Sequence, residues 1–165
     1  MANYFQTNRD VELSTIYYIE TQIDDNWSEV EVIKGFPEIG ADRATSLPSR
    51  PIVSVRLSSQ DSDRFELGNT RLRNEYLITI DIFARSDGQR LDLAGFLLDK
   101  IKDPWTYYEH AHASGDPESL DRTADGKIRV DRFISNAKVD IFDSPEKFDK
   151  FRHILSFVVV RSSLQ

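Results

Sequence analysis

The sequence predicts an α+β domain in which two main helices pack on a mostly antiparallel sheet of four to five strands. Two segments have apolar residues at helical spacing, several others alternate apolar and polar residues, and short polar turns favour antiparallel pairing. The expected order is helix, strand, strand, an interrupted third strand, a central strand, helix, strand and strand. Residues 1–165 are expected to form a single domain, because 165 residues is a usual size for one.

The first helix is expected over residues 9–25. Its evenly spaced apolar residues are Ile16, Ile19, Ile23 and Trp27. Thr7 and Asp10 stand just before them and suit the start of a helix. The apolar stripe predicts a helix that packs on a sheet.

Two strands are expected next. Residues 28–36 and residues 51–57 each alternate apolar and polar side chains, which is typical of half-buried strands. Gly and Pro residues between them predict a long loop over about residues 37–50. The polar residues 58–63 are expected to form a turn, and the interrupted third strand falls at residues 64–73.

The central strand and the second helix form the most ordered pattern of the chain, within residues 66–102. The apolar face of the strand consists of Tyr76, Ile78, Ile80, Ile82 and Ala84. Ser86 stands three residues before Gln89, the spacing of a capping box, so a helix is expected to begin here. The apolar stripe of this helix is expected to consist of Leu91, Ala94, Leu97 or Leu98, and Ile101.

Residues 103–127 show neither the helical nor the strand spacing of apolar residues and predict a second long loop. Residues 128–142 alternate and predict a strand. A closing strand at residues 151–161 is nearly continuous in apolar residues, which predicts burial on both of its faces. A neighbouring subunit could cover the second face.

The composition argues against several classes of protein. A net charge of -7 with scattered basic residues does not suit a nucleic-acid surface, although an acidic lining would let DNA slide past without binding. The absence of cysteine excludes disulfides and thiolate sites. The longest apolar run, residues 157–160, is too short to span a bilayer, so no membrane partner is expected.

Catalytic residues, cofactors and a metal site are not expected. The residues with metal-ligand character are His110, His112, Glu109 and Asp116. They lie in the expected loop, where solvation is the simpler interpretation. The tripeptide Asp125-Gly126-Lys127 matches half of a metal-dependent nuclease pattern, yet Gly126 indicates a turn. No nucleophile elbow and no glycine-rich phosphate-binding motif is present in the sequence.

Aromatic residues of the expected loop and two arginines are the candidates for contacts with another subunit or partner. Large rings in a loop either fold back over the core or anchor a partner. The arginines stand beside acidic residues and could form salt bridges across a subunit boundary or remain solvated. The candidates are Glu66, Arg71, Arg73, Trp105, Tyr107, Tyr108 and Glu109.

The segment LRNEYLITIDIFARSDGQRLDLAGFLLDKIK resembles the tail terminator (tail completion) proteins of long-tailed bacteriophages of the siphophage type. The shared style is a strand ending in an aromatic residue, a short Ser-Asp-Gly turn and a Leu-rich helix. The resemblance implies a virion structural protein that terminates tail tube polymerisation and joins the tail to the head. It also implies a homo-oligomeric ring, commonly a hexamer, through which DNA passes without sequence-specific binding.

The partners implied by the resemblance are further copies of the chain, the tail tube protein and the head completion or neck protein. The implied location is the head-proximal end of the tail, after assembly in the host cytoplasm. Two alternatives remain open. A head completion or neck connector protein beneath the portal would make nearly the same demands on the sequence. A metal-dependent hydrolase or nuclease would use residues among His110, His112, Glu109 and Asp125.

Overall fold

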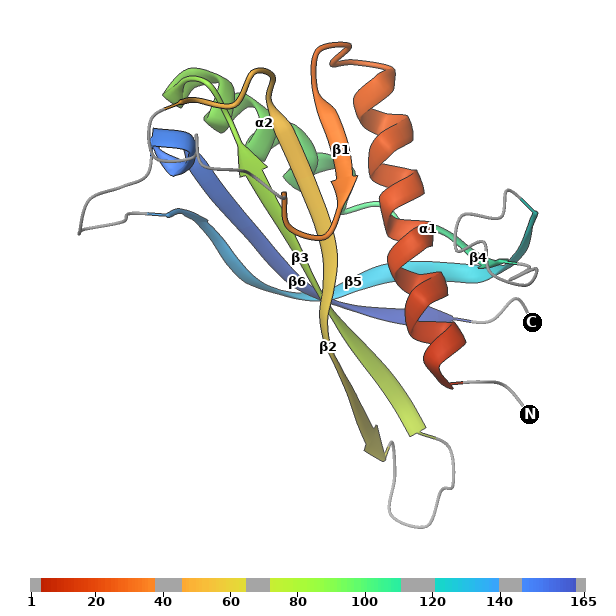
Figure 1. The fold of residues 1–165 in the computed structure, drawn as a ribbon. Helices are drawn as coiled ribbons and strands as arrows, with labels where there is room; N and C mark the ends of the chain where they lie inside the picture. The colour runs from red at the N-terminus through yellow and green to blue at the C-terminus, as the bar shows by residue number, and fades with distance from the viewer. Residues whose placement is uncertain (1–3, 38–45, 65–71, 111–120, 140–146, 163–165) are drawn as a thin grey trace.

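The computed structural model describes residues 4–37, 46–64, 72–110, 121–139 and 147–162. The elements in chain order are α1 (Tyr4–Asp24), β1 (Glu31–Lys34), β2 (Ile52–Arg64), β3 (Leu72–Phe83), α2 (Asp87–Lys100), β4 (Trp105–His110), β5 (Arg122–Lys138), the 3-10 helix η2 (Lys147–Asp149) and β6 (Arg152–Ser162) (Figure 1). The α+β class and the two main helices are confirmed.

The sheet is mixed, with six strands in the order β1-β2-β3-β6-β5-β4. Only the β1–β2 pair is parallel, and the other neighbouring strands are antiparallel. Helix α1 contacts β4 at one end of the sheet and β1 and β2 at the other end, so the sheet curls around it (Figure 1). Helix α2 packs on β3 and β6.

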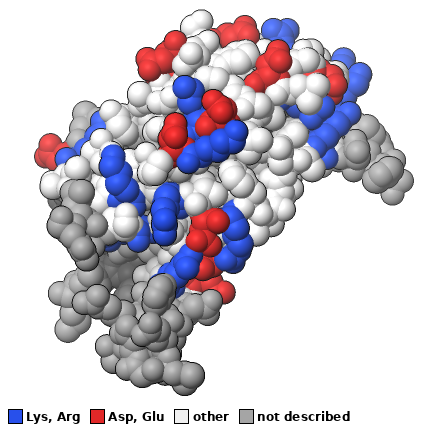
Figure 2. Space-filling model, turned by 180° about the vertical axis from the view of Figure 1, so that it is seen from behind, with Lys and Arg blue, Asp and Glu red and all other residues white. Residues whose placement is uncertain are grey.

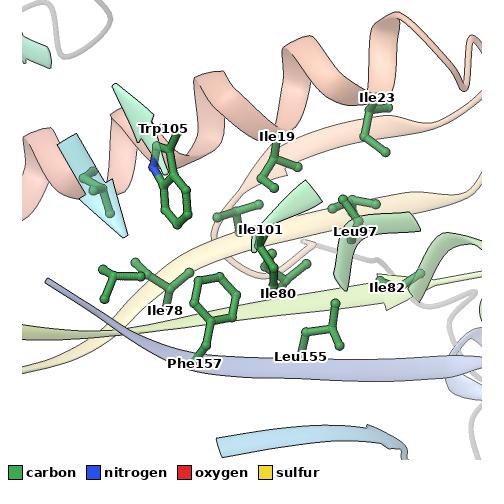
Figure 3. Packing of buried hydrophobic residues seen from close by; sticks show 14 of the residues in the cluster. Ile19, Ile23, Ile78, Ile80, Ile82, Leu97, Ile101, Trp105, Leu155 and Phe157 are labelled. Carbon is green, nitrogen blue, oxygen red and sulfur yellow. The ribbon is translucent and has the colours of Figure 1, made fainter. Parts of the chain in front are cut away.

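The core lies between the two helices and the inner face of β3 and β6 (Figure 3). The alternation predicted for the central strand is confirmed, because Ile78, Ile80 and Ile82 are all fully buried. The labelled residues that meet them from other elements are Ile19, Ile23, Leu97, Ile101, Trp105, Leu155 and Phe157. Burying one such aliphatic side chain contributes roughly 1.5–3 kcal/mol, so this cluster is the main source of stability.

The capping box at the start of α2 is confirmed. The Gln89 backbone N–H donates to Ser86 Oγ at 3.2 Å, and the Gln89 side chain reaches back to the Arg85 N–H at 3.0 Å. The predicted apolar stripe is wrong at its first position, because Leu91 is 54% exposed whereas Leu93 is fully buried. This helix carries leucine on more than one face, and packing on β6 and β3 decides which face is buried.

The prediction of a long loop at residues 103–127 is wrong, because this range contains β4 and the start of β5. Strand β4 pairs with β5 from Trp105↔Ile128 to His110↔Arg122. The aromatic side chains of β4 hide its alternation, since they occur on both of its faces. The described part of the other expected loop, Pro37 and residues 46–50, contains no helix or strand.

The turn expected at residues 58–63 and the interrupted strand expected at residues 64–73 are also corrected. Strands β2 and β3 pair along their whole length, from Ile52↔Phe83 to Arg64↔Leu72, and residues 65–71 lie outside the described residues. The sheet therefore has six strands and not four to five. Polar residues can extend a hairpin because the ladder is made by backbone groups.

The two-sided burial predicted for the closing strand is confirmed in β6. Leu155, Phe157 and Val159 lie in the core cluster, and Val158 and Val160 on the opposite face are only 5% and 6% exposed. Strand β6 lies between β3 and β5, inside the sheet. On the outer face, Arg132 of β5 is paired with Val158 in register, and Glu75 of β3 with Val160. The Arg132–Glu75 ion pair at 2.9 Å therefore crosses β6 beside these valines.

Candidate functional site

Two polar side chains of α1 bind the backbone of β4. Ser14 Oγ accepts a hydrogen bond from the Tyr108 N–H at 2.9 Å and donates to the Tyr108 carbonyl at 3.3 Å. One helical turn earlier, Asp10 Oδ1 accepts from the His110 N–H at 3.3 Å and lies 3.1 Å from His110 Nδ1. Strand β4 is the last strand of the sheet, so these side chains satisfy backbone groups that no further strand pairs.

Aromatic rings join the same helix and strand. Tyr18 stacks on Trp105 with ring centroids 5.3 Å apart, and Tyr17 meets Tyr108 edge to face at 5.8 Å. The Arg122 guanidinium carbon lies 3.5 Å from the centroid of the Tyr17 ring. Aromatic pairs of this kind contribute roughly 0.5–1.5 kcal/mol each beyond their burial. The α1–β4 seam is therefore a rigid part of the molecule.

A pocket of about 330 Å³ opens along this seam. Its lining consists of Ser14, Tyr17, Tyr18, Thr21, Pro104, Trp105, Thr106, Tyr108 and Lys127. Most of the polar atoms are hydroxyl groups, and Lys127 Nζ donates to Thr106 Oγ1 at 3.1 Å. Aromatic rings with hydroxyl groups at their tips suit a protein contact, because they offer apolar area and hydrogen bonds together.

Two tyrosines of the seam have raised pKa values. Burial raises the pKa of Tyr107 most, the nearby Arg161 opposes it, and Asp10 adds to the rise. The Arg161 guanidinium carbon lies 3.9 Å from the Tyr107 ring centroid. Burial also raises the pKa of Tyr18. Both phenols therefore stay protonated at neutral pH and act as hydrogen-bond donors, Tyr18 to the Lys100 carbonyl at 2.9 Å.

The aromatic candidates from the sequence have different places in β4. Trp105 and Tyr107 are 2% and 1% exposed and belong to the core of their own chain. Tyr108 is half-buried and lines the pocket. Glu109 is exposed, with Arg161 Nη2 at 4.0 Å. Tyr108 and Glu109 are thus the members of this group that a partner could reach.

The charged candidates lie elsewhere. Glu66 and Arg71 fall outside the described residues. Arg73 lies on the outer face of β3, where its Nε is 3.5 Å from Glu75 and its Nη2 binds Asp131 of β5. Arg73 therefore has partners within its own chain.

The described residues contain no group of three or more His, Cys, Asp or Glu side chains that could hold a metal ion, while His112 and Asp116 lie outside them. The turn expected at Gly126 is wrong, because this residue lies within β5 with a φ of 120°. Asp125 and Gly126 stand opposite the single residue Tyr107, which makes a bulge that glycine suits. The Asp125 carboxylate binds Arg161.

Sequence reasoning missed the polar residues of α1 that hold β4. Asp10, Ser14 and Thr21 are spaced so that they share one helix face with Tyr17, beside the isoleucine stripe. This polar stripe is the feature of the sequence that could have indicated a contact between α1 and another element. Asp10 and Ser14 are 3% and 0% exposed, which marks them as inward-facing residues and not as cap residues.

A second polar cluster lies at the start of α2. His153 of β6 is buried, with its Nδ1 2.8 Å from Arg90 Nη1 and its Nε2 2.7 Å from Asn136 Oδ1. Since Arg90 can only donate, Nδ1 is the acceptor and Nε2 carries the proton. Burial, and then the positive charge of Arg90, lower the pKa of His153. Arg90 is in turn bound to Asp87 at 2.9 Å.

No family model matches the chain, and no curated protein sequence matches it. No helix among the described residues combines the length and the apolar character needed to cross a bilayer.

Proposed function

We propose that this chain is a structural assembly protein that terminates tail tube polymerisation in a long-tailed bacteriophage and joins the tail to the head. The observation that carries the proposal is the segment of residues 72–102, whose strand, Ser-Asp-Gly sequence and Leu-rich helix resemble the tail terminators. This segment forms β3 and α2, and it supplies the buried centre of the fold. The proposal assigns the chain no catalytic residue and no cofactor.

The proposed assembly is a ring of identical subunits, expected to be a hexamer, with tail tube protein on one side and a head completion or neck protein on the other. A net charge of -7 supports passage of DNA through such a ring, because acidic surfaces do not retain phosphates. On the side of the molecule turned away in Figure 1, acidic and basic side chains form small mixed groups separated by uncharged surface (Figure 2). Mixed charge of this kind favours specific protein contacts over nucleic-acid binding.

Addition of the purified protein to growing tail tubes tests the proposal. We expect protein at one end of each tube in electron micrographs, and tubes that no longer elongate when fresh tube protein is added. Light scattering should give about 114 kDa for six copies of the 19.0 kDa chain. Tubes that elongate unchanged at saturating protein would refute a role in termination.

Two other results would support the alternative functions. A neck connector would leave tube elongation unchanged and would instead bind heads that lack tails. A metal-dependent hydrolase or nuclease would bind zinc or manganese stoichiometrically and lose its metal on His110→Ala substitution. Either result would replace the proposed function.

A further inference from the structure

We infer that a two-stranded arm of one copy pairs with a strand edge of the next copy that no described strand of that copy covers, an inference that rests on the proposed ring. The arm consists of residues 57–64 of β2 and residues 72–74 of β3. The open edge is the outer edge of residues 129–137 of β5, beside which the described residues place no further strand. Each copy carries one arm and one open edge, so the contact is head-to-tail and can close a ring.

The open edge begins where β4 ends. Strand β4 pairs with β5 only between Arg122 and Ile128, and beyond that point the described strands give β5 no neighbour on this side. The contrast with β4 is informative, since the outer backbone groups of β4 are bound by Ser14 and Asp10 of α1. An unpaired strand edge presents a row of N–H and C=O groups that another strand can bind.

The open edge also carries exposed apolar side chains. Phe133 is 46% exposed and Ile134 is 57% exposed, although they are adjacent in the same strand. Strand β5 has irregular register with β6 after Val130 and after Phe133. Natural edge strands use bulges and charged residues to limit pairing. This edge has both, with Asp131 and Arg132 at the first bulge, but it also places two large apolar residues at the second. An exposed apolar pair at an unpaired edge is typical of a surface that a partner covers.

The arm needs a further strand. Strand β1 pairs with β2 only from Ile52 to Val55, and β6 pairs with β3 only from Glu75 onward, so the described flanking strands stop before the arm. The contacts of the arm with other elements include the Leu57 N–H to Glu12 Oε1 at 2.9 Å and Arg73 to Asp131. In Figure 1 the arm projects away from the helices and the rest of the sheet. Its exposed residues are Ser58, Ser59, Asp61 and Ser62. A ribbon of two polar strands is marginally stable alone in water, and a third strand stabilises it.

Charge favours the arm as the occupant of the open edge. The β2 strand of the arm, residues 57–64, contains two aspartates and one arginine, whereas residues 129–137 contain two arginines and one aspartate. Opposite charges on neighbouring strands contribute roughly 0.2–1 kcal/mol per pair, and like charges oppose pairing. Pairing two copies of the open edge would instead bring arginines together. The geometry therefore points to the arm of a second copy.

Two full-length variants test the inference. Ile134→Glu blocks the open edge, because it places a negative charge opposite the aspartates of the arm. Ser59→Lys with Asp61→Lys blocks the arm, because it places positive charges opposite the arginines of the edge. Each variant alone should weaken self-association at least about tenfold by sedimentation equilibrium. Leu91→Glu is the matched control, since Leu91 is also an exposed apolar residue, at 54%, and lies on α2, outside both proposed surfaces. This control should associate as the unchanged chain does.

Mixing the two variants gives the decisive result. One competent interface remains, between the intact arm of the edge-blocked chain and the intact edge of the arm-blocked chain. The mixture should therefore stop at a one-to-one dimer of about 38 kDa, twice the 19.0 kDa chain. Dimers formed by the arm-blocked chain alone would show edge-to-edge pairing and overturn the inference. A monomeric unchanged chain, or an edge-blocked chain that assembles normally, would also overturn it.

The outcome is separable from the proposed function. If Ile134→Glu protein still forms rings that cap tail tubes, the arm-to-edge contact is wrong and the function stands. If assembly depends on both surfaces but the assembled ring never caps tubes, the contact stands and the function is wrong. Circular dichroism of both variants, unchanged from the parent chain, checks that they are folded.

Discussion

Two carboxylates on the outer face of β3 are each held between two arginines, and they differ in burial. Asp81 accepts two hydrogen bonds from Arg152, at 2.9 and 2.7 Å, and lies 2.5 Å from Arg56, with its side chain fully buried. Glu75 lies 2.9 Å from Arg132 and 3.5 Å from Arg73, with its side chain 12% exposed. The same arrangement is therefore fully buried around Asp81 at one end of β3 and partly open to solvent around Glu75 at the other.

The cover at the Asp81 end comes from aromatic residues of the same chain. Phe83 is fully buried between Phe36 at 5.5 Å and Phe148 of η2 at 5.3 Å. Arg152 also lies 4.9 Å from the Phe36 ring centroid. At the Glu75 end, β3 continues into the projecting arm. One end of β3 is thus covered by aromatic residues of its own chain, whereas the other end leads into the arm that we propose pairs with a second copy.

Truncation of a buried isoleucine at the closed end and of an exposed isoleucine on the β5 edge should give the largest contrast. Ile82→Ala at the closed end should lower the free energy of unfolding by about 3 kcal/mol, because a fully buried side chain leaves a cavity. Ile134→Ala at the open edge should lower it by less than about 1 kcal/mol in the monomer. Urea titration at low protein concentration measures both. Equal losses would contradict the comparison.

Neutralising the two carboxylates should give the second largest difference in stability between the two ends of β3. Asp81→Asn should destabilise the chain by about 2 kcal/mol, since it leaves two partly buried arginines without their counter-charge. Glu75→Gln should cost less than about 1 kcal/mol, and its effect should shrink in high salt because the pair is near solvent. A salt-sensitive Asp81 variant would show that the closed end is solvated.

Removal of a cap is the third contrast. Ser86→Ala should cost about 1 kcal/mol, because the Gln89 N–H loses its acceptor at the start of α2. Ser62→Ala in the arm removes only an exposed hydrogen bond to Asn74 and should change stability by less than about 0.5 kcal/mol. Thermal unfolding of both variants under one set of conditions provides the comparison. A larger loss from Ser62→Ala would mean that the arm contributes to the monomer core.

The smallest expected effect is a pH dependence at the closed end. The pKa of His153 is lowered in the folded chain, so the folded state favours the neutral ring. Stability from this group is complete above the unfolded pKa of about 6.5 and is lost as the pH falls below it, because only the unfolded chain gains the proton readily. His153→Gln should make the free energy of unfolding depend less on pH between about pH 7 and about pH 5. An unchanged slope would contradict this assignment.

Local signals in the sequence predicted local structure well. The capping box at Ser86 and the alternation through Ile78, Ile80 and Ile82 are both present, because each depends on residues close in the chain. The choice of Leu91 for the buried stripe failed because the partner of α2 is set by the tertiary fold. Periodicity gives the spacing of a buried face but not its exact rotation when leucines surround the helix.

The missed elements depend on distant partners. Strand β4 is held by β5 and by Asp10 and Ser14, which are far from it in sequence. The polar residues of the arm resemble a turn, because a backbone ladder leaves no apolar pattern. The surfaces proposed to join copies could not be recognised from residue types, since Phe133 and Ile134 are ordinary strand residues until their exposure is known.

Amide hydrogen exchange as a function of protein concentration tests the central comparison most directly. We predict that amides of residues 58–63 and residues 129–137 exchange more slowly as the concentration rises, because assembly pairs both strands. Amides of Val53 and Ile82, inside the sheet at the closed end, should exchange at the same rate throughout. Exchange in the arm and the β5 edge that is independent of concentration would contradict the account.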